Sequence, residues 1–501
     1  MRNLFSQFAG CADDPDQALL ITPEGEAFSY ADAERESAQL AHYLTASGIR
    51  RGDRITVQAP KSPESVWLYL ACLRGGFVYH PLNEAYQSAE LEYLVTDARP
   101  KLVVCRPERA TLFSAITRET DCHVVSLDES GAGSLVDESR AKSPNFDTVA
   151  CSDDTVAVLL YSSGTTGKPK GAMLTHANLA ANTRALIQTW GFTATDRLLH
   201  ALPMYHAHGL LVAMGCVLMS GASMIFLPKF DAQSVIRQLP GATVMMGIPT
   251  FYTRLLNEET FGRDCCDSIR LFISGSAPLL AETHEAFAAR TGHAILERYG
   301  MTETCMNSSN PLDGERRPGS VGPALPGVTI RIADDSDQPV PEGVTGEIQV
   351  RGPNVFAGYW GMPELTAQEF TADKFFRTGD LGTLSDDGYL SILGRKKDMI
   401  ITGGLNVYPR EVEKVIDELQ AVAESAVVGI PHPDFGEGVI AVIVLQIGQS
   451  TTEDRIIALV REKLADFKAP KRVFFAAQLP RNSMGKVQKN TLREQFNGVL
   501  S

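Results

Sequence analysis

The chain has 501 residues, of which 44% are hydrophobic and 21% are charged, and its formal net charge is -14. A chain of this length usually forms two or more domains, and this ordinary composition excludes a disordered or fibrous protein. The excess of acidic residues opposes nonspecific attraction to nucleic acid or to an anionic membrane surface, so we expect neither as a partner.

The cysteines and the N-terminal segment bear on the compartment of the protein. Nine cysteines are scattered without a C-x-x-C pair, and the adjacent Cys265 and Cys266 suit neither a disulfide framework nor a zinc site. The N-terminal sequence MRNLFSQFAGCADDPDQ reaches acidic residues before an apolar signal core could form. Residues 210–228 are uncharged but only mildly hydrophobic, which favours a buried helix and strand over a membrane span. We therefore expect a cytoplasmic protein.

Strand-like and helix-like runs alternate along the first part of the chain. RITVQAP precedes SPESVWLYLACLRGG, and KLVVCRP precedes ERATLFSAI, which predicts an α/β architecture with substantial parallel sheet. Residues 321–393 change to short strands separated by turns, typical of a mostly antiparallel β section. The helix and strand alternation after residue 395 predicts a small α+β domain. We predict a large N-terminal domain over residues 1–394 and a C-terminal domain over residues 395–501.

A loop with the composition of a phosphate-binding site follows the apolar run TVAVLLY. Glycine lets backbone N–H groups approach phosphate oxygens closely, while hydroxyl and ammonium groups donate further hydrogen bonds. The loop is not a Walker A motif, because Pro169 follows Lys168 where that motif has Ser or Thr. An ordinary polar turn is the alternative for the isolated stretch. The candidate phosphate contacts are Ser162, Ser163, Gly164, Thr165, Thr166, Gly167, Lys168, Pro169 and Lys170.

This loop and five later segments resemble the motifs of the adenylate-forming superfamily, which comprises acyl-CoA synthetases, luciferases and adenylation domains. The later segments occur in the family's order: SGSAPL at 274–279, ERYGMTE at 297–303, TGD at 378–380, GRKKDMIITGG at 394–404 and PRNSMGKVQK at 480–489. The resemblance implies a large N-terminal domain of α/β subdomains with a β section, and a small mobile C-terminal domain. It also implies that ATP binds between the domains and that the hinge lies at or next to Lys397.

The resemblance implies nucleotide-binding roles for several residues. Glu303 would hold Mg²⁺ with Thr302 close by, because a hard cation takes oxygen ligands and bridges phosphates. Asp380 would accept hydrogen bonds from the ribose hydroxyls, Arg395 would contact the ribose or a phosphate, and Tyr299 would stack on the adenine. Without the motifs, Glu303 would be a solvated residue, Asp380 a turn residue and Arg395 half of a surface ion pair. The other implied contacts near the nucleotide are Gly275, Ser276, Ala277, Glu297, Arg298, Gly300 and Met301.

Lys486, in NSMGKVQK, is the principal catalytic candidate that the resemblance implies. Its flexible ammonium could neutralise charge at the reacting carboxylate and at the bridging oxygen on the α-phosphorus. Lys489 lacks the preceding glycine, and a solvated tail residue is the alternative for Lys486. Acetylation by a lysine acetyltransferase would remove its charge.

The implied chemistry has two steps and needs Mg²⁺ as cofactor, with ATP and coenzyme A as co-substrates. The carboxylate of an acid attacks the α-phosphorus of ATP and forms an acyl-adenylate and diphosphate. The sulfur of coenzyme A then attacks the mixed anhydride, and AMP leaves. No protein nucleophile is required, so the cysteines need no catalytic role.

Basic residues in segments that the family uses for the acyl pocket indicate which acid the enzyme would bind. They are His206, Arg254 and Arg298, and a fatty acid would leave such charges buried without a partner. A second carboxylate on the acid would pair with the arginine fork. Together with Ser276 and Met306, these residues resemble those of malonyl-CoA synthetases. Malonate is therefore the expected acid.

Alternatives remain for the size of the acyl pocket, for the role of Arg254 and for the function of the chain. Ala207 and Met306 would limit its size near C2 of malonate, with small alkyl substituents admitted. Arg254 lies at a helical spacing from Glu258, so a surface ion pair with Glu258 or Glu259 is the alternative role. Within the family, a ligase for methylmalonate or another short acid, or an adenylation enzyme that loads a carrier protein, remains possible. Outside this family, the alternative functions are those of a phosphotransferase or NTPase and of a noncatalytic nucleotide-binding protein.

Overall fold

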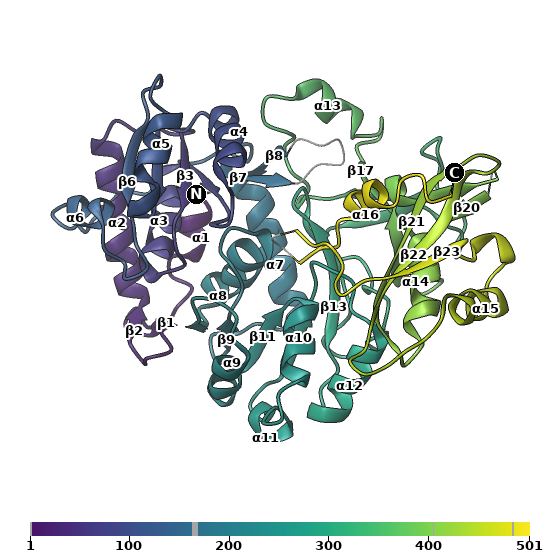
Figure 1. The fold of residues 1–501 in the computed structure, drawn as a ribbon. Coiled ribbons are helices and arrows are strands. Elements are labelled where there is room, and N and C mark those ends of the chain that lie inside the picture. The colour runs from purple at the N-terminus through teal and green to yellow at the C-terminus, as the bar shows by residue number, and fades with distance from the viewer. Residues whose placement is uncertain (1–2, 163–168, 404, 483–484, 501) are drawn as a thin grey trace. The chain divides into compact units, whose positions relative to one another are not determined.

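The computed structural model describes residues 3–162, 169–403, 405–482 and 485–500. The chain divides into two compact units (Figure 1). The first unit comprises residues 1–330 and 350–376, and the second comprises residues 331–349 and 377–501.

The first unit contains a six-stranded sheet in the order β6-β5-β3-β4-β7-β8, parallel except for the β7–β8 pair. Its central strands are apolar and buried almost throughout, because helices cover both faces of a parallel sheet. The alternation of strand and helix predicted from the sequence is confirmed here. The strands are β3 (Arg54–Gln58), β4 (Val78–Pro81), β5 (Leu102–Cys105), β6 (His123–Ser126), β7 (Val156–Ser162) and β8 (Lys170–Thr175).

Helix α3 (Pro63–Gly75) shows how local sequence sets these helix ends. Ser62 and Ser65 form a capping box at its start, and Pro63 occupies the first turn, where its missing N–H costs nothing. Gly76 ends the helix at φ +69, a conformation that glycine adopts without strain. The neighbouring helices are α1 (Leu4–Phe8), α2 (Tyr30–Ala46), α4 (Ser88–Ala98), α5 (Ala110–Ile116) and α6 (Ser134–Ser139), with a 3-10 turn at Pro107–Arg109.

The second sheet of this unit has eight strands in the order β14-β13-β12-β11-β9-β10-β1-β2. The strands from β13 to β1 pair in parallel, and β2 and β14 are antiparallel edges. In such sheets, ligands bind beyond the carboxyl ends of the parallel strands. The strands are β1 (Ala18–Ile21), β2 (Ala27–Ser29), β9 (Arg197–His200), β10 (Ser223–Phe226), β11 (Val244–Gly247), β12 (Leu271–Ser274), β13 (Leu296–Met301) and β14 (Cys305–Ser309).

One hydrophobic core runs through both sheets and includes Trp67 and Trp190. Residues 208–213 form a π-helix that continues into α8 (Met214–Ser220), so the uncharged stretch is a buried helix followed by β10, as predicted. Among the described residues, no helix combines the length and the hydrophobicity needed to cross a membrane. The other helices are α7 (His176–Trp190), α9 (Ala232–Gln238), α10 (Pro249–Leu256), α11 (Arg263–Cys266), α12 (Ala281–Thr291) and α13 (Pro363–Gln368), with a 3-10 turn at Leu239–Gly241.

The second unit begins with a four-stranded sheet in the order β15-β16-β17-β18. The β17–β18 pair is antiparallel, which confirms the β section predicted there. A 3-10 turn at Lys396–Asp398 follows β18 directly. The strands are β15 (Thr329–Ala333), β16 (Gly346–Arg351), β17 (Phe376–Leu384) and β18 (Leu390–Arg395).

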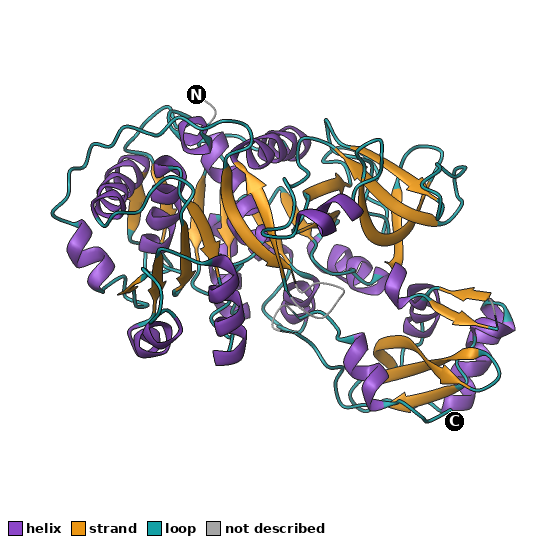
Figure 2. Cartoon of the chain, turned by 90° about the horizontal axis from the view of Figure 1, so that it is seen from above, coloured by secondary structure: helices purple, strands orange, loops and turns teal. Residues whose placement is uncertain are grey.

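The remainder of the second unit is a sheet in the order β20-β19-β22-β21, with β23 beside β22. Figure 2 draws the strands of the chain in orange and its helices in purple. Successive residues of a strand point to opposite faces, so Val427 joins one hydrophobic cluster and Val428 joins another. Both clusters also contain residues from helices, so helices cover both faces of the sheet. The elements are β19 (Ile400–Thr402), β20 (Leu405–Val407), α14 (Pro409–Asp417), β21 (Val422–His432), β22 (Gly436–Leu445), α15 (Glu453–Lys463), β23 (Arg472–Phe475) and α16 (Lys489–Gln495), with a 3-10 turn at Asp466–Lys468.

The compact units differ from the predicted domains in where they place the β section. Residues 331–349 and 377–394 group with the C-terminal residues, because β18 packs against α14. Lys397 lies within the 3-10 turn after β18. The division at residue 394 and the hinge near Lys397 stay predictions about motion.

Candidate active site

Glu303 lies buried in the turn between β13 and β14. Its Oε1 accepts hydrogen bonds from Ser162 Oγ at 2.9 Å and from Tyr359 Oη at 3.0 Å. Among the described residues, no group donates to Oε2. Glu303 is therefore not a solvated surface residue. Its carboxylate is oriented by the first residue of the predicted phosphate loop, and one oxygen is left for a ligand.

The start of β8 lies close to this carboxylate. The Lys170 Nζ is buried, 3.7 Å from Glu369 Oε1 and 5.1 Å from the centroid of the Tyr359 ring. The carbonyl of Pro169 accepts a hydrogen bond from Tyr93 Oη at 2.9 Å. Lys170 thus supports the residues around Glu303. The other predicted loop contacts lie outside the described residues: Ser163, Gly164, Thr165, Thr166, Gly167 and Lys168.

The SGSAPL and ERYGMTE segments are brought together by parallel pairing of β12 with β13, in which Ser274 is opposite Glu297. Burial of the Arg298 side chain places its guanidinium against Gly275, where a Cβ atom would lie 2.4 Å from the guanidinium carbon. Arg298 Nε and Nη2 have no hydrogen-bond partner among the described residues. Burial lowers the pKa of Arg298 to about 10, which still leaves a cation at neutral pH.

Ser276 and His208 lie next to this guanidinium. The Ser276 Oγ is 3.4 Å from His208 Nδ1, and Ser276 has φ +71, an unusual conformation for a residue other than glycine. Burial and the positive charge of Arg298 lower the pKa of His208 well below its usual value. The imidazole is therefore neutral beside a buried cation.

In the second unit, Asp380 and Arg395 face each other across the β17–β18 pair. Arg395 Nε lies 2.8 Å from Asp380 Oδ1, and Asp380 is buried. Thr378 supports both residues, because its Oγ1 accepts from the Asp380 N–H and its carbonyl accepts from Arg395 Nη1. Asp380 is thus a fixed carboxylate rather than a loose turn residue.

Lys486 is exposed at the end of a tight turn in the second unit. Its backbone N–H donates to Asn482 Oδ1, and its carbonyl accepts from the Asn482 N–H, both at 2.9 Å. Gly485 has φ +76, which the turn requires. The glycine before the motif lysine therefore has a direct structural reason.

The sequence profile of the AMP-binding enzyme family matches residues 8–360, and the profile of the AMP-binding enzyme C-terminal domain matches residues 411–486. The chain belongs to the AMP-binding enzyme family. It is an acid–thiol ligase, specifically an ATP-dependent, AMP-forming acyl-CoA synthetase, as the resemblance implied.

Three proteins resemble this chain over nearly its whole length. The mitochondrial malonate–CoA ligase of Mus musculus is 37% identical, over 96% of this chain and 89% of its own length. The sulfoacetate–CoA ligase of Cupriavidus necator is 34% identical, over 95% and 94%. The crystal structure of ATP-bound MatB from Rhodopseudomonas palustris is 50% identical, covers 100% of both chains and has a TM-score of 0.98.

The other predicted acyl contacts of this ligase differ in how deeply they lie. Met306 is buried on β14 opposite Gly300, where a Cβ would meet its Cε at 2.4 Å. His206 is half-buried beside the Tyr205 ring and lies near enough to His208 to influence it electrostatically. Ala207 is half-buried against the core.

Arg254 lies on the exposed side of α10, whereas Phe251 and Tyr252 on the same helix are buried. Among the described residues, it forms no ion pair with Glu258 or Glu259, the alternative considered from the sequence. Its predicted role in binding the acid stays a prediction.

The remaining predicted nucleotide contacts cluster at the ends of β12 and β13. Glu297 and Tyr299 are buried on β13, and Glu297 Oε1 accepts from the Gly319 N–H at 3.3 Å. Ala277, which follows β12, and Met301 and Thr302, at the end of β13 and just after it, are half-buried. Parallel pairing thus gathers segments that are far apart in the sequence.

Two residues of the candidate active site were not singled out from the sequence. His208 lies two positions after His206 and directly precedes the apolar run GLLVAMG, which could have indicated that it is the buried histidine. Tyr359, in AGYW, carried no signal beyond being aromatic, because its contact with Glu303 joins distant segments.

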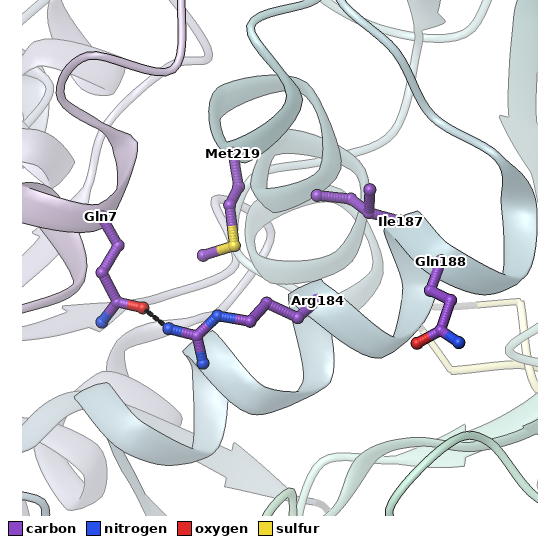
Figure 3. A pocket seen from close by; sticks show the side chains of 5 residues that line it. All are labelled: Gln7, Arg184, Ile187, Gln188 and Met219. Carbon is purple, nitrogen blue, oxygen red and sulfur yellow. Dashed lines mark hydrogen bonds between the residues drawn. The ribbon is translucent and has the colours of Figure 1, made fainter.

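A separate pocket of about 440 Å³ lies between α1, α7 and α8 of the ligase (Figure 3). Gln7 and Arg184 are hydrogen-bonded across it, and none of its lining residues belongs to the family motifs. It is therefore distinct from the candidate active site. The lining residues are Gln7, Arg184, Ile187, Gln188 and Met219.

Proposed function

We propose that this ligase is a malonyl-CoA synthetase, which converts malonate, ATP and coenzyme A into malonyl-CoA, AMP and diphosphate through malonyl-adenylate. The observation that carries this proposal is the buried guanidinium of Arg298, with Nε and Nη2 unpartnered among the described residues. An isolated buried cation is unfavourable, so an acid with a second anionic group would stabilise it. Malonate offers one carboxylate to Arg298 while the other reacts.

Neighbouring side chains support the same assignment. The neutral imidazole of His208 could share the distal carboxylate without adding a second buried charge. His206 and Arg254 would be further contacts of that carboxylate, and Ser276 would line the pocket. Met306, with Ala207, would restrict substituents at C2.

Glu303 would hold Mg²⁺ through its open oxygen, because magnesium is usually bound by one or two carboxylates together with substrate phosphates and waters. When bound, Mg²⁺ would neutralise phosphate charge. Ser162 and Tyr359 would keep the carboxylate oriented. Asp380 would accept hydrogen bonds from the ribose hydroxyls, with Arg395 fixing the carboxylate or contacting a phosphate.

Lys486 would donate to the attacking carboxylate and to the bridging oxygen at the α-phosphorus, where negative charge converges during displacement. The carboxylate oxygen forms the new P–O bond as the bond to diphosphate breaks. In the second step, the thiolate of coenzyme A attacks the carbonyl carbon, and AMP departs with the electron pair. Acetylation of the exposed Lys486 would block the first step.

Sulfoacetate is the second candidate acid. Its sulfonate would also pair with Arg298, and a relative 34% identical to this chain is named a sulfoacetate–CoA ligase. Methylmalonate is a third candidate, because it keeps both carboxylates of malonate. Transfer to a carrier protein in place of coenzyme A would change only the second step.

An acid panel tests the proposal. The purified enzyme would be given ATP, Mg²⁺ and coenzyme A with malonate, methylmalonate, sulfoacetate, acetate, octanoate or ferulate. Diphosphate release would be followed, and thioesters would be identified by mass spectrometry. We expect the highest kcat/KM with malonate and malonyl-CoA as the product. If malonate is no faster than acetate or octanoate, the proposal is wrong.

The proposed setting is cytoplasmic, with small molecules as partners. The nine cysteines are free in the structure, and the net charge of -14 disfavours binding to nucleic acid.

A further inference from the structure

Lys61 lies in the loop after β3, and its ammonium is enclosed although part of the residue is exposed. Its Nζ is 2.8 Å from His200 Nδ1, 2.7 Å from the carbonyl oxygen of His200 and 2.6 Å from that of Leu227. The Phe226 ring covers a fourth side, with its centroid 4.3 Å away. Lys61 therefore connects the six-stranded sheet to the carboxyl ends of β9 and β10 in the eight-stranded sheet.

The contacts of His200 define its tautomer. His200 Nε2 lies 2.9 Å from the carbonyl oxygen of Gly209, which can only accept, so Nε2 carries the proton. Burial and the charge of Lys61 lower the pKa of His200 to about 3, so the ring is neutral and Nδ1 is an acceptor. Burial lowers the pKa of Lys61 well below its usual value. Three acceptors nevertheless lie within 2.8 Å of its Nζ, an arrangement that the three donors of an ammonium satisfy.

The Gly209 carbonyl belongs to the π-helix at residues 208–213. It also accepts the i→i+5 bond from the Met214 N–H, so His200 supplies its second hydrogen bond. A Cβ at Gly209 would lie 2.1 Å from the Pro203 carbonyl oxygen, which shows how closely this turn packs. Single π turns are frequent at functional sites.

This π turn carries His208, the neighbour of Gly209. His208 faces Ser276 Oγ at 3.4 Å, and the electrostatic influence of Arg298 reaches its ring. A continuous line of contacts therefore runs from Lys61 through His200 and Gly209 to the residues assigned to the acyl pocket.

We propose that Lys61 and His200 are positioning residues for the acyl pocket: Lys61 fixes the Nε2–H tautomer of His200, which holds the Gly209 carbonyl and sets the place of His208. This inference rests on the proposed function only in assigning His208 to the pocket. Neither residue touches the reacting atoms. Their loss is expected to raise KM for the acid while leaving KM for ATP unchanged.

Two substitutions at His200 separate its two hydrogen bonds. In His200→Gln, the amide nitrogen replaces Nε2 and donates to the Gly209 carbonyl. In His200→Asn, the shorter amide can accept from Lys61 but does not reach Gly209. We expect KM for the acid to rise about tenfold in H200N, the equivalent of roughly one hydrogen bond, and to change less than about threefold in H200Q. Equal values in the two variants would overturn the proposal.

Lys61→Met tests the other end of the line. It removes three donated bonds while keeping the length of the side chain, and we expect a rise of about tenfold in KM for the acid with KM for ATP within about twofold. An unchanged KM for the acid, or equal rises for the acid and ATP, would overturn the role of Lys61. Should K61M fail to fold, the two His200 variants still decide the inference.

The tautomer is measured without any substrate. Long-range proton–nitrogen NMR spectra of the full chain with labelled histidine should show a neutral His200 with its proton on Nε2, and H200Q assigns the signal. A proton on Nδ1, or a charged ring at neutral pH, would overturn the inference. The kinetic comparisons use whichever acid the wild-type enzyme prefers. A best acid other than malonate would therefore refute the proposed function and leave this test intact.

Discussion

The guanidinium of Arg298 occupies the space that a side chain at Gly275 would need. A Cβ at Gly275 would lie 2.4 Å from the guanidinium carbon and 2.6 Å from Nε. We expect Gly275→Ala to displace Arg298 and to raise KM for malonate by about tenfold or more, because well-packed sites do not absorb such overlap. Steady-state kinetics with malonate and ATP measure this effect. Gly262→Ala is the matched control, because nothing lies within 4 Å of a Cβ there.

Replacing Arg298 itself tests the charge. Arg298→Met keeps much of the side-chain length but removes the cation that would bind the distal carboxylate. We expect kcat/KM for malonate to fall by about a hundredfold or more, in line with roughly 3 to 5 kcal/mol for losing one partner of a buried charge pair. The activity with acetate should change much less. An equal loss with both acids would contradict the assignment of Arg298 to the distal carboxylate.

The support of Glu303 predicts a magnesium-dependent phenotype. Glu303→Gln removes the charge, and Tyr359→Phe removes one of the two hydrogen bonds that orient Oε1. We expect E303Q to need far more Mg²⁺ for diphosphate exchange, and Y359F to lose about tenfold or more in rate, in line with roughly 1.5 to 3 kcal/mol for one hydrogen bond to a charged group. Titration of the exchange rate with Mg²⁺ measures both. A Mg²⁺ requirement unchanged in E303Q would remove Glu303 from the proposed metal site.

The segment that carries Lys486 forms an ion pair near each of its ends. Arg481 pairs with Glu424 and donates to the Gly485 carbonyl at 2.5 Å, and Lys489 Nζ lies 2.6 Å from Glu413 Oε1. If Lys486 acts only in adenylation, Lys489→Met should slow diphosphate exchange about tenfold but leave the reaction of synthetic malonyl-adenylate with coenzyme A unchanged.

Controls separate this effect on the Lys486 segment from a general loss of structure. Lys489→Arg keeps the charge and should restore most of the exchange rate. Lys463→Met breaks an exposed pair with Glu418 on a different segment and should change neither half-reaction. If K489M slows both half-reactions equally, Lys489 does not act through Lys486.

The sequence predicted those parts of the molecule that local patterns determine. The apolar strand-like runs and the helix-like segments between them identified the elements, and the motif order identified Glu303, Asp380 and Lys486 as candidates. The contacts of Tyr359 and Lys61 were not predictable, because each joins segments that only the fold brings together. The sequence also did not show which individual basic side chains are buried.

His208 and Arg254 show that the burial of a basic residue could not be predicted from its sequence neighbours. Both are basic residues near the motifs, yet His208 is buried beside Arg298 and Arg254 lies on the exposed side of its helix. The residues around Arg254 fit an amphipathic helix whether the Arg254 side chain faces the core or the solvent. The spacing of the apolar residues therefore did not predict the exposure of Arg254.

Asp417 predicts a pH dependence of stability in the second unit. Burial and the nearby carboxylates of Glu413 and Glu424 raise its pKa to about 7, although Ser425 donates to Oδ1 and Arg410 lies 3.7 Å from Oδ2. The folded state therefore holds a proton that the unfolded state releases near pH 4, and this contribution to stability is lost as the pH rises toward and through about 7.

Asp417→Asn removes that titration while keeping an acceptor for Ser425. We expect D417N and the wild-type protein to unfold at similar urea concentrations at pH 4, and D417N to be more stable at pH 8 by on the order of 1 to 3 kcal/mol. Glu418→Gln, at the exposed neighbouring position, should show no such divergence, because its carboxylate remains in water. If wild-type and D417N stabilities keep the same difference across this pH range, Asp417 ionises in the folded state as it does in the unfolded chain.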